Sequence, residues 1–109
     1  MMPVISLKKK MDEIRGKHCS PIDVVRVNDQ VVRMSYLDGE FHWHKHNNQD
    51  ELFYILKGNL VIQLRNQPDI ILSKGQMAMI PKGVAHCPKS IGPTYVLLFE
   101  PFVLQSQGD

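Results

Sequence analysis

Long apolar runs are missing from this sequence of 109 residues, as are a strong excess of one charge and a set of paired cysteines. No stretch approaches the roughly 18 consecutive apolar residues that a membrane-spanning helix requires. The segment from Met1 to Lys10 lacks the apolar centre of a signal peptide. Cys19 and Cys87 are too few for a multi-bridge scaffold. We therefore expect a cytoplasmic protein that has reduced thiols and no membrane partner.

The charge balance argues against a nucleic-acid partner. Thirteen Lys and Arg residues face eleven Asp and Glu residues, which leaves a formal charge of +2. This margin is too thin for the basic patch that nucleic-acid binding needs. The run Lys8-Lys9-Lys10 is typical of a solvated helix face. The length and the ordinary 43% hydrophobic content predict one globular domain over residues 1–109.

Turn-forming residues interrupt the chain at short and regular intervals, and the segments between them are rich in Val, Ile, Leu, Phe and Tyr. Short strands at such spacing predict an all-β sandwich or barrel, here with its core over about residues 22–104. The expected strands are Ile22–Val27, Val31–Leu37, Leu52–Leu56, Leu60–Leu64, Ile70–Leu72, Met77–Ile80 and Tyr95–Phe99.

Both ends of the chain lie outside this strand pattern. Near the start, Leu7, Met11 and Ile14 have helical spacing, Ser6 can cap the helix and Gly16 can end it. At the other end, Gln105–Asp109 is expected to be a frayed tail.

Three of the five histidines lie within the five residues His42-Trp43-His44-Lys45-His46. Phe41 and Trp43 favour a strand, on which the three imidazoles would share one face. Such a cluster predicts a metal site, because neutral imidazole binds Zn, Cu, Fe and Ni. A carboxylate follows at Asp50 or Glu51, and spacing alone does not choose between them.

Two motifs in the sequence resemble those of the cupin superfamily. The first runs from Gly39 through His44-x-His46, four residues, Glu51 and six residues to Gly58, with one residue fewer than usual before His44. The second has Gly75, five residues, Pro81-Lys82-Gly83, two residues and His86, and it ends with Ser90 where asparagine is common. The resemblance covers Gly39–Ser90, about half of the chain.

This resemblance implies a double-stranded β-helix, a small jelly-roll barrel with a metal ion in its mouth. It assigns His44, His46, Glu51 and His86 as metal ligands, and it leaves Asp50 as a turn residue or a residue that supports the ligands. The expected cofactor is one divalent transition metal ion, Fe, Mn, Ni, Cu or Zn.

Two residues next to these ligands have less certain roles. His42 is a candidate catalytic acid or base, a support for the ligands or a rim residue. Cys87 directly follows His86 and is expected to face away from the metal as a packed thiol.

The side chains expected to wall the cavity are mostly apolar, and four polar ones are candidates for holding a substrate. The apolar residues come from strands expected to wall the cavity, and which of them face inward is left open until the register is known: Met34, Met77, Met79, Phe53, Tyr54 and Ile80. The polar set is Tyr36, Gln63, Arg65 and Tyr95.

Several functions are compatible with this resemblance, because relatives include isomerases, dioxygenases, decarboxylases, lyases and storage proteins. The first hypothesis is a metal-dependent enzyme acting on a small oxygenated molecule, and the alternative is a non-catalytic binding or sensing module. Small members are often labelled mannose-6-phosphate isomerase-like, although only Arg65 and Lys82 could serve a phosphate here. A homodimer is expected, because the apolar run Val96–Phe99 with Phe102, Val103 and Leu104 is long for so small a core.

Overall fold

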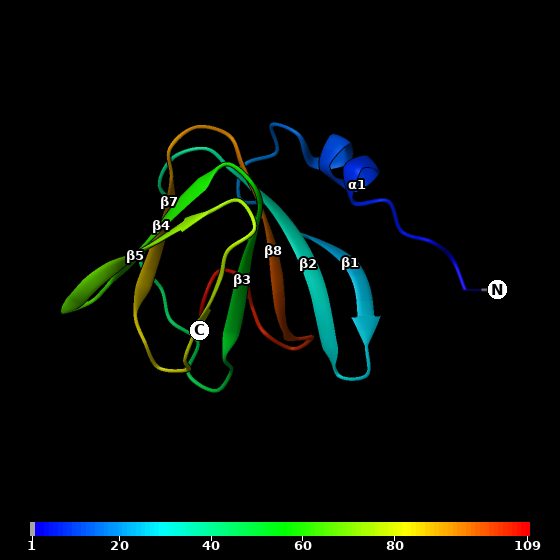
Figure 1. Ribbon diagram of the computed structural model, residues 1–109. Coiled ribbons are helices and arrows are strands. Elements are labelled where there is room, and N and C mark those ends of the chain that lie inside the picture. The colour runs from blue at the N-terminus through cyan, green and yellow to red at the C-terminus, as the bar shows by residue number, and fades with distance from the viewer. Residues whose placement is uncertain (1) are drawn as a thin grey trace.

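The computed structural model describes residues 2–109 as two antiparallel sheets and a short helix (Figure 1). Five strands form one sheet in the order β1-β2-β8-β3-β6, and three form the other in the order β5-β4-β7. The elements are α1 (Leu7–Ile14), β1 (Ile22–Val27), β2 (Gln30–Leu37), β3 (Glu51–Lys57), β4 (Asn59–Leu64), β5 (Gln67–Ser73), β6 (Met77–Ile80), β7 (His86–Ser90) and β8 (Thr94–Pro101). This arrangement is that of a jelly-roll barrel, and it confirms the predicted fold class.

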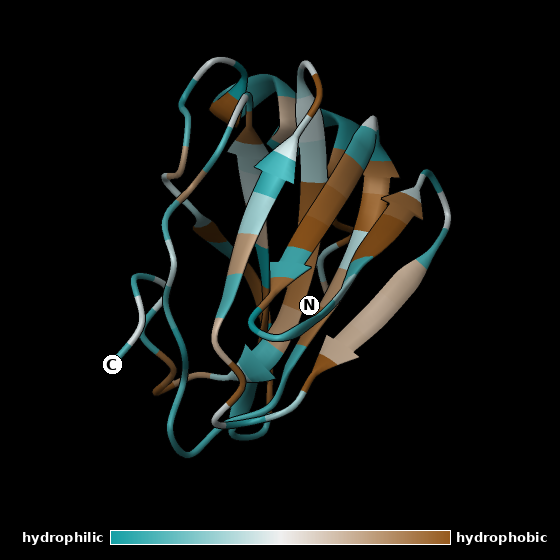
Figure 2. Ribbon diagram, turned by 90° about the vertical axis from the view of Figure 1, so that its left-hand side faces the viewer, coloured by the Kyte–Doolittle hydropathy of each residue, from teal (hydrophilic) through white to brown (hydrophobic). Residues whose placement is uncertain are grey.

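The main core lies between the two sheets. On β3, the alternate residues Glu51, Phe53 and Ile55 are buried, whereas Leu52 and Tyr54 on the opposite face are half-buried. Apolar side chains from both sheets meet these inward positions, and Figure 2 shows that apolar residues concentrate on the strands. The buried members of this core are Leu37, Phe53, Ile55, Leu60, Ile62, Leu72, Ile80, Val96 and Leu98.

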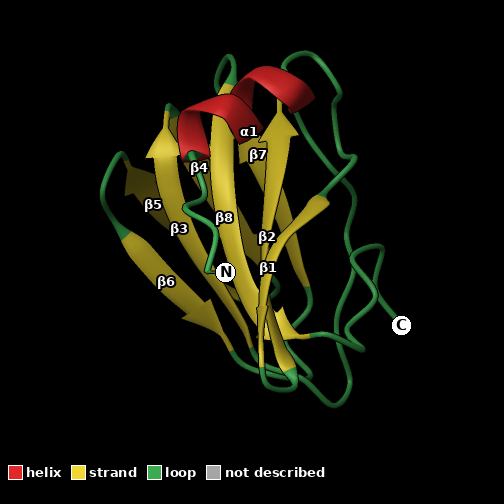
Figure 3. Ribbon diagram, turned by 90° about the vertical axis from the view of Figure 1, so that its right-hand side faces the viewer, coloured by secondary structure: helices red, strands yellow, loops and turns green. Residues whose placement is uncertain are grey.

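The predicted helix is confirmed, with the expected cap. The Ser6 hydroxyl accepts a hydrogen bond from the Lys9 backbone N–H at 3.2 Å, and α1 begins at the next residue, Leu7. Ile14 is buried at the end of the helix. It packs with Met34 and Tyr36 in a second core on the outer face of the five-stranded sheet, which α1 crosses in Figure 3.

Strand β7, which carries His86, is absent from the strands predicted above. Its sequence, His-Cys-Pro-Lys-Ser, has no apolar alternation. It becomes a strand because it pairs with β4, with Ile62 opposite Pro88 and Leu64 opposite His86. It is an edge strand of its sheet, the place where a proline without an N–H is tolerated.

The register decides which of the candidate wall residues face the cavity. Met34 and Tyr54 lie on the outer face of the five-stranded sheet, and so do Met77 and Met79. The register of β3 and β6 pairs Leu52 with Met79 and Tyr54 with Met77, which places both methionines on the outer face of the sheet. Their exposed fractions are 58% and 51%. Ile80, the next residue after Met79, is buried in the main core and therefore faces inward. A shift of one residue in the register would turn both methionines to the inner face, and a four-residue apolar segment does not reveal the register.

Candidate metal centre

The histidine-rich segment is extended but forms no regular strand, so that part of the prediction is wrong. It touches β7 at isolated points, where Glu40 bridges Lys89 and His44 bridges His86. At the second point the two backbones exchange hydrogen bonds of 3.0 Å from His44 N and 2.9 Å from His86 N. This exchange holds two histidines that are distant in sequence directly opposite each other.

Four side chains meet at the mouth of the barrel: His44, His46, Glu51 and His86. One donor atom from each lies within 4.8 Å of the other three. His46, Glu51 and His86 are only 2%, 3% and 1% exposed, and His44 is half-buried. The Glu51 Oε1 atom lies 3.4 Å from His46 Nε2 and 3.5 Å from His86 Nε2.

Backbone carbonyls set the tautomers of two of these histidines. His44 Nδ1 lies 2.9 Å from the His42 carbonyl oxygen, and His86 Nδ1 lies 2.9 Å from the Val84 carbonyl oxygen. A carbonyl only accepts, so each Nδ1 carries the proton and donates it. The lone pair is therefore on Nε2 of each ring. This is the arrangement that supports metal-ligating imidazoles.

Unpartnered atoms in the cluster fit a cation. Within residues 2–109, no hydrogen-bond partner reaches either ring nitrogen of His46, Oε1 of Glu51 or Nε2 of His86. Buried polar atoms without partners are costly, and a metal ion would satisfy several of them at once. Three imidazoles and one carboxylate suit Fe, Mn, Ni, Cu or Zn. The cluster could therefore hold a divalent transition metal ion.

The electrostatics of the cluster favour the protonation states that metal binding needs. Burial lowers the pKa of His44 to about 4, so its imidazole is neutral at neutral pH. Burial by itself would raise the pKa of Glu51, but the His46 and His86 rings beside its carboxylate outweigh burial and hold that pKa well below the usual range. Glu51 is therefore ionised. Metal ligands must be deprotonated in this way.

The structure also places Asp50 and His42, two residues close to the ligands in the sequence. The Asp50 carboxylate lies outside the cluster and accepts a hydrogen bond from the Lys82 N–H at 2.8 Å, in the turn before β7. The His42 ring also lies outside the cluster, with its Nε2 3.0 Å from the Gln107 carbonyl oxygen. The catalytic role of His42 stays a prediction.

The C-terminal segment is docked at this mouth, which contradicts the frayed tail that was expected. Besides the Gln107 contact to His42, the Asp109 N–H donates to the Lys45 carbonyl at 3.0 Å. The Asp109 carboxylate accepts from the Asn47 N–H. Backbone contacts of this kind carry no periodic pattern, so the sequence contains no signal for them.

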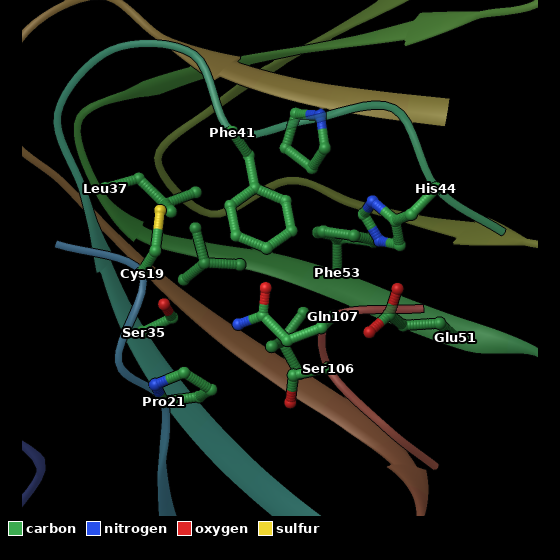
Figure 4. A pocket seen from close by; sticks show the side chains of 13 residues that line it. Cys19, Pro21, Ser35, Leu37, Phe41, His44, Glu51, Phe53, Ser106 and Gln107 are labelled. Atoms are coloured by element: carbon green, nitrogen blue, oxygen red, sulfur yellow. The ribbon is translucent and has the colours of Figure 1, made fainter. Parts of the chain in front are cut away.

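A pocket opens beside the cluster (Figure 4). The volume of the pocket, including the part that is open to solvent, is about 450 Å³. His44 and Glu51 form one end, whereas Cys19, Pro21 and Ser35 form the opposite part of the wall. The complete lining is Cys19, Pro21, Ser35, Leu37, Phe41, His44, Glu51, Phe53, Pro88, Val96, Leu98, Ser106 and Gln107.

The polar residues expected to hold a substrate lie elsewhere. Tyr36 and Tyr95 are buried in the second core, with their ring centroids 5.3 Å apart. Gln63 donates to Glu40 at 3.3 Å. The Arg65 guanidinium lies over the Trp43 ring, 4.5 Å from its centroid. Ser106 and Gln107, which the sequence did not single out, line the pocket instead.

Glu100 is a second buried carboxylate whose importance the sequence did not reveal. Burial, together with the nearby Glu51 charge, raises its pKa to about 9, although Arg33 opposes the shift. Arg33 Nη1 lies 3.7 Å from Glu100 Oε2. The hydrogen bonds of Arg33 go to other groups: Nε donates to the Asp23 carboxylate, Nη1 to the Leu104 carbonyl and Nη2 to the Phe102 carbonyl. Glu100 is therefore a neutral acid next to the ionised Glu51.

The sequence matches the Cupin domain family over residues 24–100. The chain is a cupin. The predicted family is thus confirmed, and the two motifs that carried it contain all four residues of the cluster. This cupin is 35% identical to the uncharacterized protein YdbB of Bacillus subtilis (strain 168), over 82% of its own length and 78% of that protein.

Solved and curated relatives show how far the likeness extends. A cupin-2 domain containing protein from Shewanella frigidimarina superposes with a TM-score of 0.85 at 36% identity, over 90% of this cupin and 94% of that chain. At 21% identity, the cupin aligns over 96% of its length with 3-hydroxyanthranilate 3,4-dioxygenase of Bos taurus but spans only 38% of that enzyme. Among the described residues, no helix is long and apolar enough to cross a membrane.

Proposed function

We propose that this cupin is a metal-dependent enzyme acting on a small oxygenated molecule, with His44, His46, Glu51 and His86 as the metal ligands. The observation that carries the proposal is the position of the cluster: His44 and Glu51 also line the pocket, so a molecule in the pocket reaches the donor atoms. Four protein donors leave one or two positions on a five- or six-coordinate ion, which is typical of catalytic sites.

The chain's own residues prepare this chemistry. A bound divalent ion would supply Lewis acidity toward an oxygen of the substrate. The carbonyls of His42 and Val84 fix the rings of His44 and His86 before any ligand arrives. The apolar walls contributed by Phe41 and Phe53 keep water away from the reacting end of the pocket.

The reaction type within this proposal is that of a dioxygenase, an isomerase or a lyase. The distant likeness to the bovine dioxygenase supports the first of these. The label mannose-6-phosphate isomerase-like gains no support from the pocket, since its lining within residues 2–109 includes no Lys or Arg to bind a phosphate.

A binding or sensing module is the second candidate function, and one observation favours it. The titratable groups of the pocket wall are Cys19, His44 and Glu51, and the last two are assigned to the metal. Burial raises the pKa of the Cys19 thiol, which makes it a poor base at neutral pH. An enzyme that moves protons would need a further base, whereas a binding module would not.

Metal analysis of the protein purified without chelator or nickel resin tests the site. We expect about one transition metal ion per chain and its loss in His46→Ala. His18→Ala is the matched control, because His18 lies outside the cluster and accepts a hydrogen bond from the Asp38 N–H. Circular dichroism must show both variants folded. A metal-free wild type that also refuses added Fe, Mn, Co, Ni, Cu and Zn would refute the proposal.

Turnover separates the two candidate functions. The metal-loaded protein is incubated with a panel of hydroxy and keto acids, in the presence and absence of air. Mass spectrometry measures the products, and the absorption spectrum of the cobalt-loaded form measures binding. Product formation that disappears in His46→Ala supports the enzyme. Spectral shifts without any product support the binding module and overturn the enzyme.

We also propose that the cupin forms a homodimer through the outer face of the five-stranded sheet. The apolar C-terminal run is not the surface, because Val96, Leu98 and Leu104 are buried in the single chain. Another apolar row supports the dimer instead. The strand registers align Met79, Leu52, Phe99, Val32 and Val25 across the sheet.

Several side chains of this row are open to solvent. Met79 is 51% exposed and Phe99 is 41% exposed. Exposed apolar faces of this kind mark interfaces. Light scattering after size-exclusion chromatography should give a dimer for the wild type and a monomer for Met79→Lys. A monomeric wild type at micromolar concentration would overturn this proposal.

A further inference from the structure

The walls of the pocket are apolar apart from the cluster and a few neutral groups. Eight of its lining residues are apolar side chains or a thiol: Cys19, Pro21, Leu37, Phe41, Phe53, Pro88, Val96 and Leu98. Ser35, Ser106 and Gln107 provide the neutral polar groups. Among residues 2–109, no Lys or Arg side chain lines the pocket, so a metal ion held by the cluster would be its only positive charge. A second anionic group on a ligand would therefore be buried without a partner, which is costly.

We infer that the ligand of this site carries one oxygen-donor headgroup for the metal and an uncharged, largely apolar body, and that residues 105–109 form the wall that selects this body. The inference rests on the proposed metal-binding function. It names Gln107 as the polar contact of that wall.

Residues 105–109 are held against the metal-binding segment by contacts at several points. The Gln107 carbonyl accepts from His42 Nε2 at 3.0 Å, and the Asp109 N–H reaches the Lys45 carbonyl at 3.0 Å. A turn closes the segment, with the Gly108 N–H donating to the Gln105 carbonyl at 2.9 Å. These contacts join the segment to the residues on either side of His44.

Gly108 allows the segment to approach His44 closely. The φ of Gly108 is +95°, which lies in the left-handed region that residues with side chains rarely adopt. A Cβ atom added at this position would lie 2.7 Å from the Cβ atom of His44. The wall therefore stands in contact with a residue of the cluster, at the metal end of the pocket.

The Gln107 side chain extends from this wall toward the interior of the pocket (Figure 4). Its carboxamide can donate and accept hydrogen bonds but carries no charge. It therefore suits a neutral hydroxyl, carbonyl or amine substituent on an otherwise apolar ligand. Ser35, on the wall formed by β2, offers a second neutral contact.

Hydroxamates test the inference, because they bind metal through the same two oxygens whatever their body. The probes are benzohydroxamate with an apolar ring, acetohydroxamate with a methyl group, and succinic monohydroxamate with a carboxylate. They are titrated into the cobalt-loaded protein, and the visible cobalt spectrum reports binding. Burial of the ring should make benzohydroxamate bind about tenfold tighter than acetohydroxamate. Succinic monohydroxamate should bind weakest of the three.

Two changes test the wall. A chain that ends at Leu104 should still fold, since that residue is buried and none of residues 105–109 is. In this chain the preference for benzohydroxamate should fall to within about twofold, because one side of the pocket is open to water. Gln107→Ala should weaken the binding of 4-hydroxybenzohydroxamate, whose ring hydroxyl can reach the carboxamide, about fivefold, the effect of one lost hydrogen bond of about 1 kcal/mol. Gln105→Ala, on the same segment but outside the pocket lining, should not.

The outcomes separate this inference from the function on which it rests. A wild type that shows no cobalt band refutes the proposed metal site. A normal cobalt band with equal affinity for the three probes refutes the ligand class alone. Unchanged selectivity in the shortened chain, or equal effects of Gln107→Ala and Gln105→Ala, refutes the role of the wall.

Discussion

Glu100 should make the stability of the metal-free cupin depend on pH, and Glu100→Gln should remove that dependence. The Glu100 side chain is 0% exposed. Neither of its carboxylate oxygens has a hydrogen-bond partner within the described chain, and the nearest cation is Arg33, 3.7 Å away. Burial and the Glu51 charge raise the pKa of Glu100 from 4.5 to about 9.

The sign of the effect follows from this upward shift. Below pH 4.5, which is the ordinary pKa of Glu100, the carboxyl is protonated in both the folded and the unfolded chain. As the pH rises, the unfolded chain releases the proton first. The folded state therefore loses stability progressively until the pH passes the folded pKa of about 9. Each pH unit between the two pKa values costs the folded state about 1.4 kcal/mol. The loss in unfolding free energy therefore approaches about 5 kcal/mol at a pH of about 8.

Glutamine has nearly the shape of the protonated acid but releases no proton. Its amide has no better partners than the acid, which costs about 1–3 kcal/mol at every pH. The change with pH is therefore the quantity to measure. Relative to wild type, the unfolding free energy of Glu100→Gln should rise by about 2–5 kcal/mol between a pH of about 5 and a pH of about 8.

Urea denaturation of the chelator-treated protein, followed by circular dichroism at several pH values, measures this difference. Glu13→Gln is the control, because Glu13 is an exposed helix residue with only an i,i+3 contact to Lys10. A difference between Glu100→Gln and wild type that stays constant with pH would refute the reasoning. It would mean that Glu100 is ionised in the folded protein and paired effectively with Arg33.

Two further changes test the fold. Gly58→Ala should destabilise the cupin by about 3 kcal/mol or more, because the added Cβ would lie 2.6 Å from the Pro93 carbonyl oxygen at a φ of +93°. Gly92→Ala, with open space around its Cβ and a φ of +77°, should cost only about 1 kcal/mol, and equal losses in thermal denaturation would contradict the steric argument. Ser6→Ala should cost about 1 kcal/mol through the lost N-cap, measured by urea denaturation, and an unchanged midpoint would show that α1 needs no cap.

Features that depend on neighbouring residues were predictable from the sequence. The strands Ile22–Val27 and Met77–Ile80 were predicted to the residue, because turn-forming residues bound them closely. The N-cap and the C-terminal end of α1 were also predicted correctly from the sequence. The spacing of the two cupin motifs located the family and all four residues of the cluster, since each motif is a short stretch of chain.

Features that depend on which distant segments meet in the fold could not be predicted from the sequence. The strand expected at residues 41–46 was wrong, and the direction of Met77 could not be predicted, because chain path and sheet register are set by partners far along the sequence. The choice of Glu51 over Asp50 needed the family resemblance, since both carboxylates have suitable chemistry.

The sequence by itself therefore determined the family, most strands and the chemistry of the cluster, because local spacing and residue type encode them. Only the tertiary structure brought Gln107 to the pocket and Glu100 to the neighbourhood of Glu51. Both placements follow from backbone pairing and burial across the whole barrel. Such contacts are long-range, and no pattern within either segment records them.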